Sequence, residues 1–349
     1  MNNPKLSVII PIYGVEERIE KCAISLFEQT LQEIEYIFVN DCTPDNSLFI
    51  LNKIIEKYPK RKENIILINH QQNKGLSAAR LTGLNIATGE YIIHCDSDDW
   101  VEPNMYELML SKAKEENADI VCAGLFYDDG EKVSVDTFSS HISPMSKMDY
   151  LSKIPLGGKY SSLCNKLIKR ELYFSNNVFP IQGISMWEDM VVTYRLVYYS
   201  KKISIISTPL YHYIHNNNSI SSPKSYNENN VKQQIECAQF IENFFKNKEI
   251  NEYKKYNLLI QFLKFASKAP YLTNKNIRDL KSWQNIFPET HKYIMEYTEI
   301  SFLSKLNYLL ACTPFIKISA KIFDIYNSIK QNNLIIKKYF GVRTKKVDK

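Results

Sequence analysis

The sequence LSVIIPIY, residues 6–13, is a continuous apolar run close to the start of the chain. A run of this length is typical of a β-strand that is covered on both faces, as in a parallel sheet. Apolar residues at helical spacing follow in residues 19–27, and EYIFVND, residues 35–41, predicts the next strand. The chain therefore opens with a predicted strand–helix–strand unit.

The same alternation continues up to about residue 127. Further strands are predicted in NIILINH (64–70), EYIIHCD (90–96) and DIVCAGLFY (119–127), with helices between them. This order indicates βαβ units, an α/β fold and a largely parallel sheet, whose ligands bind outside the carboxyl ends of the strands. We therefore expect one edge of the sheet to carry the polar residues that follow the strands, which are Tyr13, Asn40, Asp41, His70 and Asp96 to Asp99.

The composition is that of an ordinary globular protein. The 349 residues are 44% hydrophobic and 23% charged, which suits one large or two modest domains. The net charge of +6 permits anionic ligands or an anionic membrane surface, and we expect no nucleic-acid partner. The seven cysteines form no C-x-x-C pair, which argues against a zinc site and a disulfide framework. A signal segment and a spanning helix are not evident, so we expect a cytoplasmic protein.

The segment HCDSDDW, residues 94–100, places three carboxylates directly after a predicted strand. Carboxylates this close repel one another unless a cation or water compensates them. One interpretation is a site for Mg²⁺ or Mn²⁺, which one or two carboxylates can hold while the phosphates of a ligand fill other positions. The other is a solvated acidic turn or a helix cap, since Asp99 precedes a predicted helix. The segment alone leaves both interpretations open.

Five segments occur in a fixed order: SVIIPIYGVEERIEKCAISLFEQT, EYIFVNDCTPDNS, NKGLSAARLTGL, GEYIIHCDSDDW and WEDM. Together they resemble the family 2 glycosyltransferases of the GT-A fold, which build bacterial capsules, O-antigens and similar glycans. The resemblance covers roughly residues 4–220. It implies a Rossmann-like nucleotide-diphospho-sugar transferase fold and inverting transfer of a hexosyl or N-acetylhexosaminyl group. The donor would be a nucleotide sugar, such as a UDP sugar, and the cofactor a divalent metal, Mn²⁺ or Mg²⁺.

The resemblance implies a nucleobase site at the first segments. Pro11 and Tyr13, after the first strand, would line the base pocket, and Asp41 would accept a hydrogen bond from a uracil-type base. The family usually has two acidic residues where this chain has Asn40 and Asp41. Arg80 would approach the base or the diphosphate. The alternatives are a packing role for Tyr13, a turn-forming Asp41 and an ordinary salt-bridged Arg80.

The resemblance also divides the acidic segment. Asp96 would lie near the ribose, with Ser97 among the donor-binding residues, and Asp98 would bind the metal that bridges the pyrophosphate. Some relatives take a further metal ligand from a histidine after the last strand, and His212 in LYHY is the candidate here. A lone histidine is, however, more often structural than a metal ligand.

The segment WEDM, residues 187–190, is the second predicted chemical centre. Glu188 and Asp189 would lie in the first turn of a helix, where the helix dipole alone would favour acidic residues. Inverting transfer also requires a base that takes the proton of the acceptor hydroxyl. In the family this base is the second residue of the Glu–Asp pair, which is Asp189, and Glu188 would help to position the acceptor.

We predict two regions, a GT-A catalytic domain at 1–222 and a mostly helical C-terminal extension at 223–349. Helical patterns lie at 230–245, 253–266 and 302–329. Apolar residues interspersed with lysines, followed by a basic tail, suit an interfacial helix on an anionic membrane and a peripheral location on its inner face. An ordinary packed helical subdomain with a basic end is the equal alternative.

The predicted function is sugar transfer to a glycan or a lipid-linked acceptor in capsule, O-antigen or exopolysaccharide synthesis. A nucleotidyltransferase is the nearest alternative, but it would be expected to have a Gly-rich basic phosphate loop, and IPIYGVEE is not one. The alternative outside enzymes is an inactive glycan-binding relative. The intact Asp98, Glu188 and Asp189 argue against it.

Overall fold

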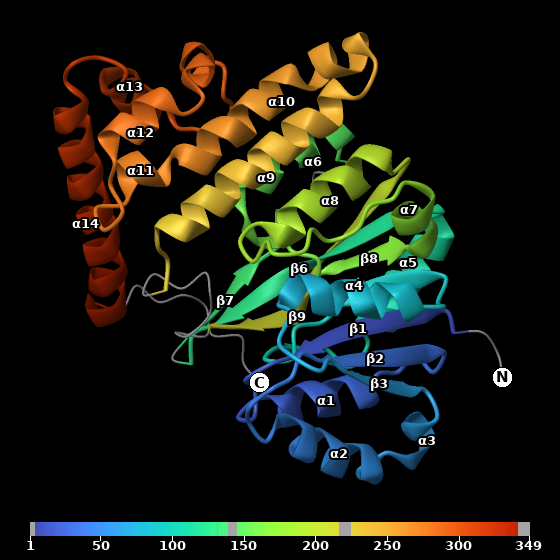
Figure 1. The fold of residues 1–349 in the computed structure, drawn as a ribbon. Coiled ribbons are helices and arrows are strands. Elements are labelled where there is room, and N and C mark those ends of the chain that lie inside the picture. The colour runs from blue at the N-terminus through green and yellow to red at the C-terminus, as the bar shows by residue number, and fades with distance from the viewer. Residues whose placement is uncertain (1–3, 131, 139–144, 216–224, 341–349) are drawn as a thin grey trace. The chain divides into compact units, whose positions relative to one another are not determined.

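The computed structural model describes residues 4–130, 132–138, 145–215 and 225–340 (Figure 1). The chain divides into two compact units, Met1–Tyr226 and Asn227–Lys349, where we predicted a boundary between 222 and 223. Each unit is described by itself.

The described residues of the first unit form a nine-stranded mixed sheet. Its strands are β1 Leu6–Ile12, β2 Ile34–Asn40, β3 Ile65–Asn69, β4 Tyr91–His94, β5 Trp100–Val101, β6 Ile120–Asp128, β7 Val133–Asp136, β8 Lys166–Lys169 and β9 Ile203–Ile214. They are ordered β3-β2-β1-β4-β8-β6-β9-β5, and β7 pairs with β6. Strands β1 to β4 pair in parallel, whereas β8 is antiparallel to both β4 and β6. The predicted α/β fold with a mostly parallel sheet is confirmed.

Helices cover both faces of this sheet, with α1 and α2 on one side and α4 on the other (Figure 1). The helices of the unit are α1 Ile19–Phe27, α2 Ser47–Lys57, α3 Pro59–Lys62, α4 Leu76–Ile86, α5 Met105–Glu116, α6 Lys147–Lys153, α7 Arg170–Ser175 and α8 Glu188–Tyr199. Helix α4 lies very close to β1, because a Cβ atom on Gly83 would be only 2.4 Å from Ile9 Cγ2. A residue larger than glycine would therefore push this helix away from the sheet.

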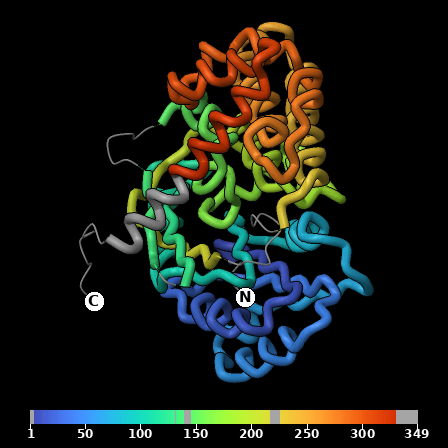
Figure 2. The backbone as a smooth tube through the Cα atoms, turned by 90° about the vertical axis from the view of Figure 1, so that its left-hand side faces the viewer, coloured from blue at the N-terminus to red at the C-terminus, as the bar shows by residue number. Residues whose placement is uncertain are grey.

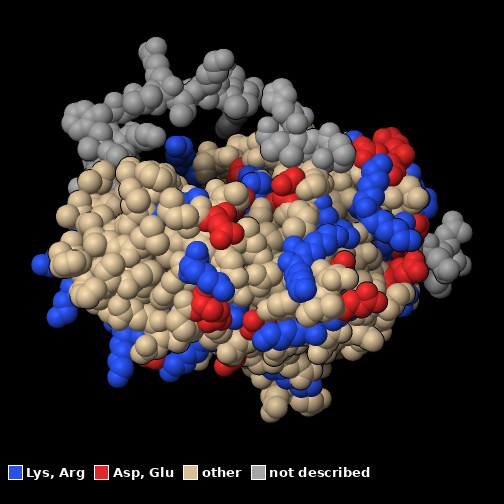
Figure 3. All heavy atoms as spheres, turned by 90° about the horizontal axis from the view of Figure 1, so that it is seen from above, with Lys and Arg blue, Asp and Glu red and all other residues tan. Residues whose placement is uncertain are grey.

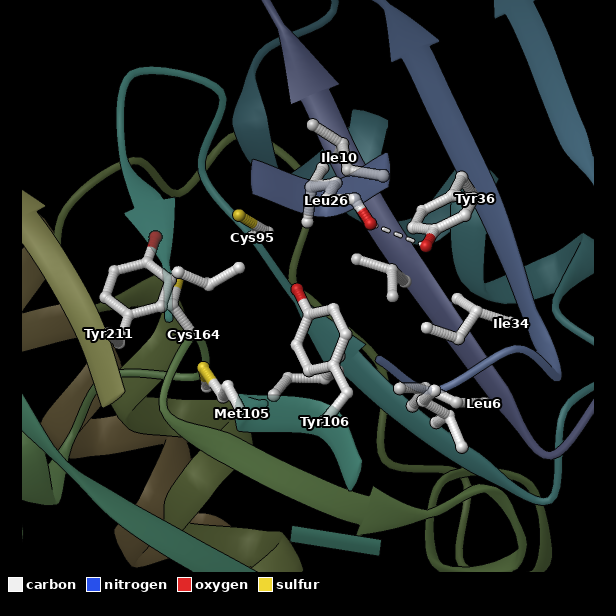
Figure 4. Close-up of a cluster of buried hydrophobic side chains, with 14 of the residues drawn as sticks. Leu6, Ile10, Leu26, Ile34, Tyr36, Cys95, Met105, Tyr106, Cys164 and Tyr211 are labelled. Carbon is white, nitrogen blue, oxygen red and sulfur yellow. Dashed lines mark hydrogen bonds between the residues drawn. The ribbon is translucent and has the colours of Figure 1, made fainter. Parts of the chain in front are cut away.

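Every residue of β1 and β2 is buried, as expected for strands with helices on both sides. The side chains of Leu6, Ile10 and Leu26 belong to one buried apolar cluster with Tyr36, whose hydroxyl donates to the Leu26 carbonyl at 2.6 Å (Figure 4). Figure 4 also shows Cys95, Cys164 and Tyr211 in this cluster, near Met105 and Tyr106. The core therefore extends directly beneath the residues that follow β4.

The second unit is helical. Its helices are α9 Glu228–Lys246, α10 Ile250–Lys268, α11 Pro270–Thr273, α12 Leu280–Asn285, α13 Phe302–Ala311 and α14 Ile316–Phe340. Helices α9 and α10 pack side by side (Figures 1 and 2). The helical pattern predicted over 302–329 forms two helices instead of one, because Pro314 lies between them and lacks the N–H that a continuing helix needs. Among the described residues, every helix is too short or too polar to cross a bilayer.

Candidate active site

The parallel strands end together at one edge of the sheet. Ile12 is opposite Asn40, and Asn40 is opposite Asn69, so the three strands finish at the same level. The next residues continue this alignment, since Asp41 N donates to the Ile12 carbonyl at 3.0 Å and His70 N to the Asn40 carbonyl at 2.9 Å. The predicted edge of polar residues therefore exists.

Asp41 is buried at this edge and anchors the loop that leads into α4. Its carboxylate accepts hydrogen bonds from the backbone N–H of Lys74 at 2.8 Å and of Gly75 at 2.7 Å. It also lies 2.7 Å from Nδ1 of His70. A carboxylate has about four acceptor positions, and three contacts already use this one. The predicted hydrogen bond from a nucleobase would take the fourth position, on a side chain whose orientation is already fixed. Sequence reasoning placed His70 at the edge but did not identify it as a partner of Asp41.

The two residues predicted to line the base pocket differ in exposure. Tyr13 lies just beyond β1 with 51% of its surface exposed, so its ring is available to a ligand instead of packed in the core. Pro11 was expected after the strand, and this is wrong: it lies within β1, buried and opposite Val39. It is tolerated there because β4 pairs with β1 only as far as Ile9, so the missing N–H falls beyond that ladder.

Arg80 joins two segments that are far apart in the sequence. It is 3% exposed on α4 and donates from Nη2 to Asp96 Oδ1 and from Nη1 to Glu188 Oε1, both at 2.9 Å. Burial would lower the pKa of Arg80, but the two carboxylates raise that pKa well above its ordinary value. The structure therefore shows a salt-bridged Arg80, with partners that are themselves predicted site residues. Arg80 Nε is buried and lacks a hydrogen-bond partner among the described residues.

The acidic segment after β4 divides into residues with different environments. Asp96 accepts from Arg80 on one oxygen, and the Cys164 thiol donates to the other at 3.2 Å. Ser97 is buried, with 4% of its surface exposed. The side chain of Asp98 is 26% exposed and lies 4.0 Å from Nη1 of Arg18. Arg18 was not identified as a site residue from the sequence. Its position in the segment after the first strand is a signal that could have suggested it.

Asp99 does not cap the next helix, so that interpretation is wrong. Helix α5 begins at Met105, while the buried Asp99 carboxylate accepts from the Tyr211 hydroxyl at 2.6 Å and from Ile214 N at 2.8 Å. Burial, followed by the charges of Asp98 and Asp96, raises the pKa of Asp99 well above its ordinary range. Asp99 therefore holds β9 against the acidic segment.

The donor set at this segment fits a metal that is shared with a phosphate ligand. Among the described residues, His, Cys, Asp and Glu side chains form no group of three with metal-binding geometry. The side chains of Asp98 and Asp96 are both partly exposed, but Asp96 has both oxygens engaged. One or two carboxylates, with the remaining positions left to phosphate and water, are what Mg²⁺ usually takes from a protein.

His212 was the second predicted metal ligand, and its contacts favour the structural alternative. The ring is stacked between Trp100 at 3.3 Å and Phe126 at 4.2 Å, measured between ring centroids. Its Nε2 lies 2.6 Å from Glu102 Oε1, and Lys21 Nζ lies 4.0 Å from the centroid of the Trp100 ring. Burial lowers the pKa of His212, with Glu102 opposing this. These contacts account for its position without a metal.

Glu188 and Asp189 form the first turn of α8, as predicted. The Glu188 side chain is 12% exposed, and burial together with the negative charge of Asp189 raises its pKa to about 7, although Arg80 opposes this. Burial also raises the pKa of Asp189, whose Oδ1 accepts from its neighbour Met190 N at 2.7 Å. A carboxylate with a raised pKa is a stronger base when it is ionised.

One residue next to Asp41 and one next to Glu188 have left-handed backbone conformations. Cys42, directly after Asp41, has φ of +58°, and Trp187, directly before Glu188, has φ of +66°. Residues other than glycine rarely adopt this conformation, at a cost of about 1–3 kcal/mol, and such residues cluster at functional sites. Both strained positions therefore mark the points where the chain turns to present a site carboxylate.

Lys166 is a second buried cation near α8 that sequence reasoning missed. Its Nζ donates to the carbonyl oxygens of Lys159 and Ser162, which fixes the loop before β8. Thr193 on α8 donates from its hydroxyl to the Ser161 carbonyl of the same loop at 2.8 Å. Burial lowers the pKa of Lys166 to about 8. A lysine in a short strand carries no sequence signal for this role.

Comparisons with known proteins identify relatives of this chain. The model of the family described as Glycosyl transferase family 2 matches residues 7–174. The EpsH protein of Bacillus subtilis (strain 168) is 34% identical over 217 residues, which span 61% of each chain. A cholesterol galactosyltransferase of Borreliella burgdorferi is 31% identical over 298 residues, covering 79% of this chain and 78% of that protein. The chain thus aligns with about three fifths of EpsH and about three quarters of the second relative.

Among solved structures, S. aureus TarS 1–349 in complex with UDP-GlcNAc superimposes with a TM-score of 0.69. It covers 93% of this chain and 92% of that chain at 19% identity. At this identity the similarity establishes the fold.

Proposed function

The chain belongs to glycosyltransferase family 2, and on that premise we propose that it transfers a sugar from a nucleotide-sugar donor to a hydroxyl group, with inversion at the anomeric carbon. We propose a UDP sugar as the donor. The acceptor is a glycan or a lipid-linked glycan in the synthesis of a bacterial surface polysaccharide. The fold shared with TarS, which was solved with UDP-GlcNAc, supports this class of donor.

The observation that carries the proposal is the bridge made by Arg80. Asp96 follows a strand end where nucleotides bind in α/β sheets, and Glu188 begins the helix that carries the candidate base. One guanidinium holds both carboxylates at 2.9 Å. This contact supports the proposal that the acidic segment after β4 and the pair Glu188–Asp189 belong to one site, as a direct displacement requires.

The donor would bind along the sheet edge. Tyr13 offers an exposed ring on which a base can stack, and Asp41 offers a fixed carboxylate that can accept the N–H of a uracil. Asp96 and Ser97 would lie on the ribose side. This arrangement selects a base with an N–H donor where Asp41 has its remaining acceptor position.

Asp98 is the residue we assign to a divalent metal, Mn²⁺ or Mg²⁺, with the diphosphate supplying the other ligands. The bound metal would neutralise the charge that develops on the leaving diphosphate. The guanidinium of Arg18 lies 4.0 Å from the Asp98 carboxylate. It would help to neutralise the charge on the leaving diphosphate. Asp99, with its carboxylate engaged by Tyr211 and Ile214, keeps the acidic segment in place.

Asp189 is the proposed base. The acceptor oxygen attacks the anomeric carbon, the bond from that carbon to the diphosphate oxygen breaks, and the hydroxyl proton passes to Asp189. Glu188 is held by Arg80 and would orient the acceptor. The hydroxyl proton of the acceptor becomes more acidic as its oxygen bonds to the anomeric carbon. The raised pKa of Asp189 then favours uptake of this proton.

A hydrolysis screen over a panel of UDP, GDP, TDP and CMP sugars tests the donor proposal without requiring an acceptor. We expect slow release of UDP from one or more UDP sugars, faster with Mn²⁺ than with a chelator. Release from another nucleotide class alone would overturn the UDP assignment. Transfer of a nucleotidyl group, with release of pyrophosphate from a nucleoside triphosphate, would overturn the whole proposal.

The acceptor is proposed to lie at a membrane. The relative from Borreliella burgdorferi is named for cholesterol, a membrane lipid, and this relative aligns with 79% of the chain. A lipid-linked acceptor would require the enzyme to work at the cytoplasmic face of the membrane as a peripheral protein.

A further inference from the structure

Two consecutive helices of the second unit, α13 and α14, expose an unusual amount of apolar surface. Among the side chains of these helices and of the turn between them that the structure describes, ten large apolar ones have 37–78% of their surface exposed. We call them the α13–α14 apolar surface, and they are Phe302, Leu303, Leu306, Leu309, Phe315, Ile318, Ile322, Ile325, Tyr326 and Ile329. Contiguous exposed apolar surface marks an interaction site, whereas scattered single residues do not.

The same helices bury a different set of side chains, so the exposed surface is not needed for the core. In α14, Ile316, Ala320 and Phe323 are buried, while Ile318, Ile322 and Ile325 are exposed. The exposed positions repeat every three or four residues and therefore form a stripe along one side of the helix. Helix α14 is thus apolar on two sides, and one of them is occupied by its own unit.

The charges beside this stripe are basic. Lys317 and Lys321 are exposed and four residues apart, so they share one flank of α14. The acid of this segment, Asp324, is paired with Arg278 of the same unit, at 2.9 and 2.6 Å. At the left of Figure 3, broad uncharged surface has Lys and Arg side chains at its rim. From residue 330 onward the sequence adds seven basic residues and a single acid, Asp348.

We infer that the α13–α14 apolar surface docks on an anionic lipid bilayer, with its apolar side chains in the interfacial region and Lys317 and Lys321 among the headgroups. An apolar stripe flanked by lysines is the pattern of helices that lie in a membrane surface. Each lysine near an anionic surface strengthens such binding, and the apolar side chains add their own burial. This goes beyond the proposed transfer reaction, although it would bring the site to a lipid-linked acceptor.

A second copy of the chain fits the surface less well. Helices that pair through an apolar stripe usually carry charges of both signs along its flanks. Here the flank carries Lys317 and Lys321, and Asp324 is already neutralised by Arg278. Two copies packed through this stripe would add like charges beside an apolar seam, whereas anionic lipid supplies the opposite charge.

Co-sedimentation of the full chain with vesicles tests the inference. Vesicles of phosphatidylcholine with phosphatidylglycerol are compared with phosphatidylcholine alone, at low and at high salt. We expect binding to the anionic vesicles that weakens with salt. The double variant Ile322→Gln/Ile325→Gln should weaken it by about tenfold or more. The variant Lys317→Gln/Lys321→Gln should weaken binding to anionic vesicles by about fivefold for each lysine.

Ser328→Gln is the matched control, because it places the same side chain at an exposed polar position of the same helix. It should leave vesicle binding unchanged, and all of these variants should leave donor hydrolysis in solution unchanged. Failure to bind anionic vesicles at low salt would overturn the inference and leave the proposed reaction untouched. It would also be overturned if the isoleucine variant converted a dimer into a monomer in sedimentation equilibrium while vesicle binding persisted.

Discussion

Each of the two units contains a buried cation that bridges two carboxylates. In the first unit Arg80 contacts Asp96 and Glu188, and in the second Lys264 contacts Glu242 at 2.9 Å and Glu289 at 2.5 Å. The two cations are almost equally buried, with 3% exposure of the residue for both. Burial and pairing are therefore common to both regions and cannot by themselves identify a site.

The surroundings of the two clusters differ. Arg80 connects a strand end to the start of a helix, in a site that also holds the partly exposed Asp98 and two carboxyls whose pKa values are raised. Lys264 lies on α10 among helices, with its Nζ 4.7 Å from the centroid of the Phe287 ring. A buried cation thus indicates function when its partners belong to a ligand-binding edge, and stability when they belong to helix packing.

The largest expected difference between the two regions is in the rate of transfer, and Asp189→Asn tests it. The amide keeps the shape but cannot accept the acceptor proton, so we expect transfer to fall by about 10²–10⁴-fold with donor affinity unchanged. Glu289→Gln, the corresponding change in the helical cluster, should leave the rate of transfer unchanged. Steady-state transfer and calorimetric titration with UDP measure the two properties, and near-normal transfer by Asp189→Asn would remove it from the role of base.

Asp98→Ala tests whether the first region requires a metal. Wild-type protein should bind UDP more tightly with Mn²⁺ than with a chelator, and the variant should lose this difference because a carboxylate ligand is gone. Transfer should fall by about 10²-fold. Asp324→Asn, an acid of the helical unit, is the control. If Mn²⁺ strengthened UDP binding equally in Asp98→Ala and wild type, the metal assignment would be lost.

Arg80→Met and Lys264→Met compare the two cations directly. Removing Arg80 leaves two mostly buried carboxylates, and we expect a loss of about 3–5 kcal/mol in the free energy of unfolding together with loss of transfer. Removing Lys264 should cost less, about 1–3 kcal/mol, because the Glu289 side chain is 43% exposed and can be hydrated. Its folded fraction should retain normal kcat.

Urea unfolding and transfer assays measure these effects. Arg80→Lys is the companion variant and should be more stable than Arg80→Met, because it keeps the positive charge. It should still lose transfer, since an ammonium group cannot replace the planar guanidinium that donates to both carboxylates. Equal effects of Arg80→Met and Lys264→Met on kcat would show that the two clusters do not differ in function.

Glu188→Gln should change how the free energy of unfolding depends on pH. The pKa of Glu188 is raised to about 7 by burial, from 4.5, so the folded state binds this proton more tightly than the unfolded chain does. Its contribution to stability is present below pH 4.5 and is lost as the pH rises through 7. Between pH 5 and 8, wild type should therefore lose roughly 1–3 kcal/mol of unfolding free energy relative to Glu188→Gln. Parallel pH profiles would contradict the raised pKa.

Most of the fold could be predicted because it depends on local patterns. The apolar runs at 6–13 and 35–41 became β1 and β2, and the polar residues after them reached one edge, since parallel strands end together. The pattern at 302–329 was less informative. The periodicity continued through Pro314, but the missing N–H of that residue broke the helix in two.

The candidate site was predicted in its members but not in their contacts. The order of five segments indicated Asp96, Arg80 and Glu188, yet their mutual distances depend on how α4 and α8 lie over the sheet. Asp99 shows the same limit. Its position suggested a cap for the following helix, but its partner Tyr211 lies 112 residues further along the chain.

The sequence by itself therefore determined the alternation of strands and helices, the family and the edge at which the polar residues gather. Only the tertiary structure decided which carboxylate of HCDSDDW is buried and bonded to β9, which is paired with Arg80 and which lies near Arg18. The physical reason is range. Periodicity and turn chemistry act over a few residues, whereas the environment of a charge is set by groups that the order of the strands brings together from distant parts of the chain.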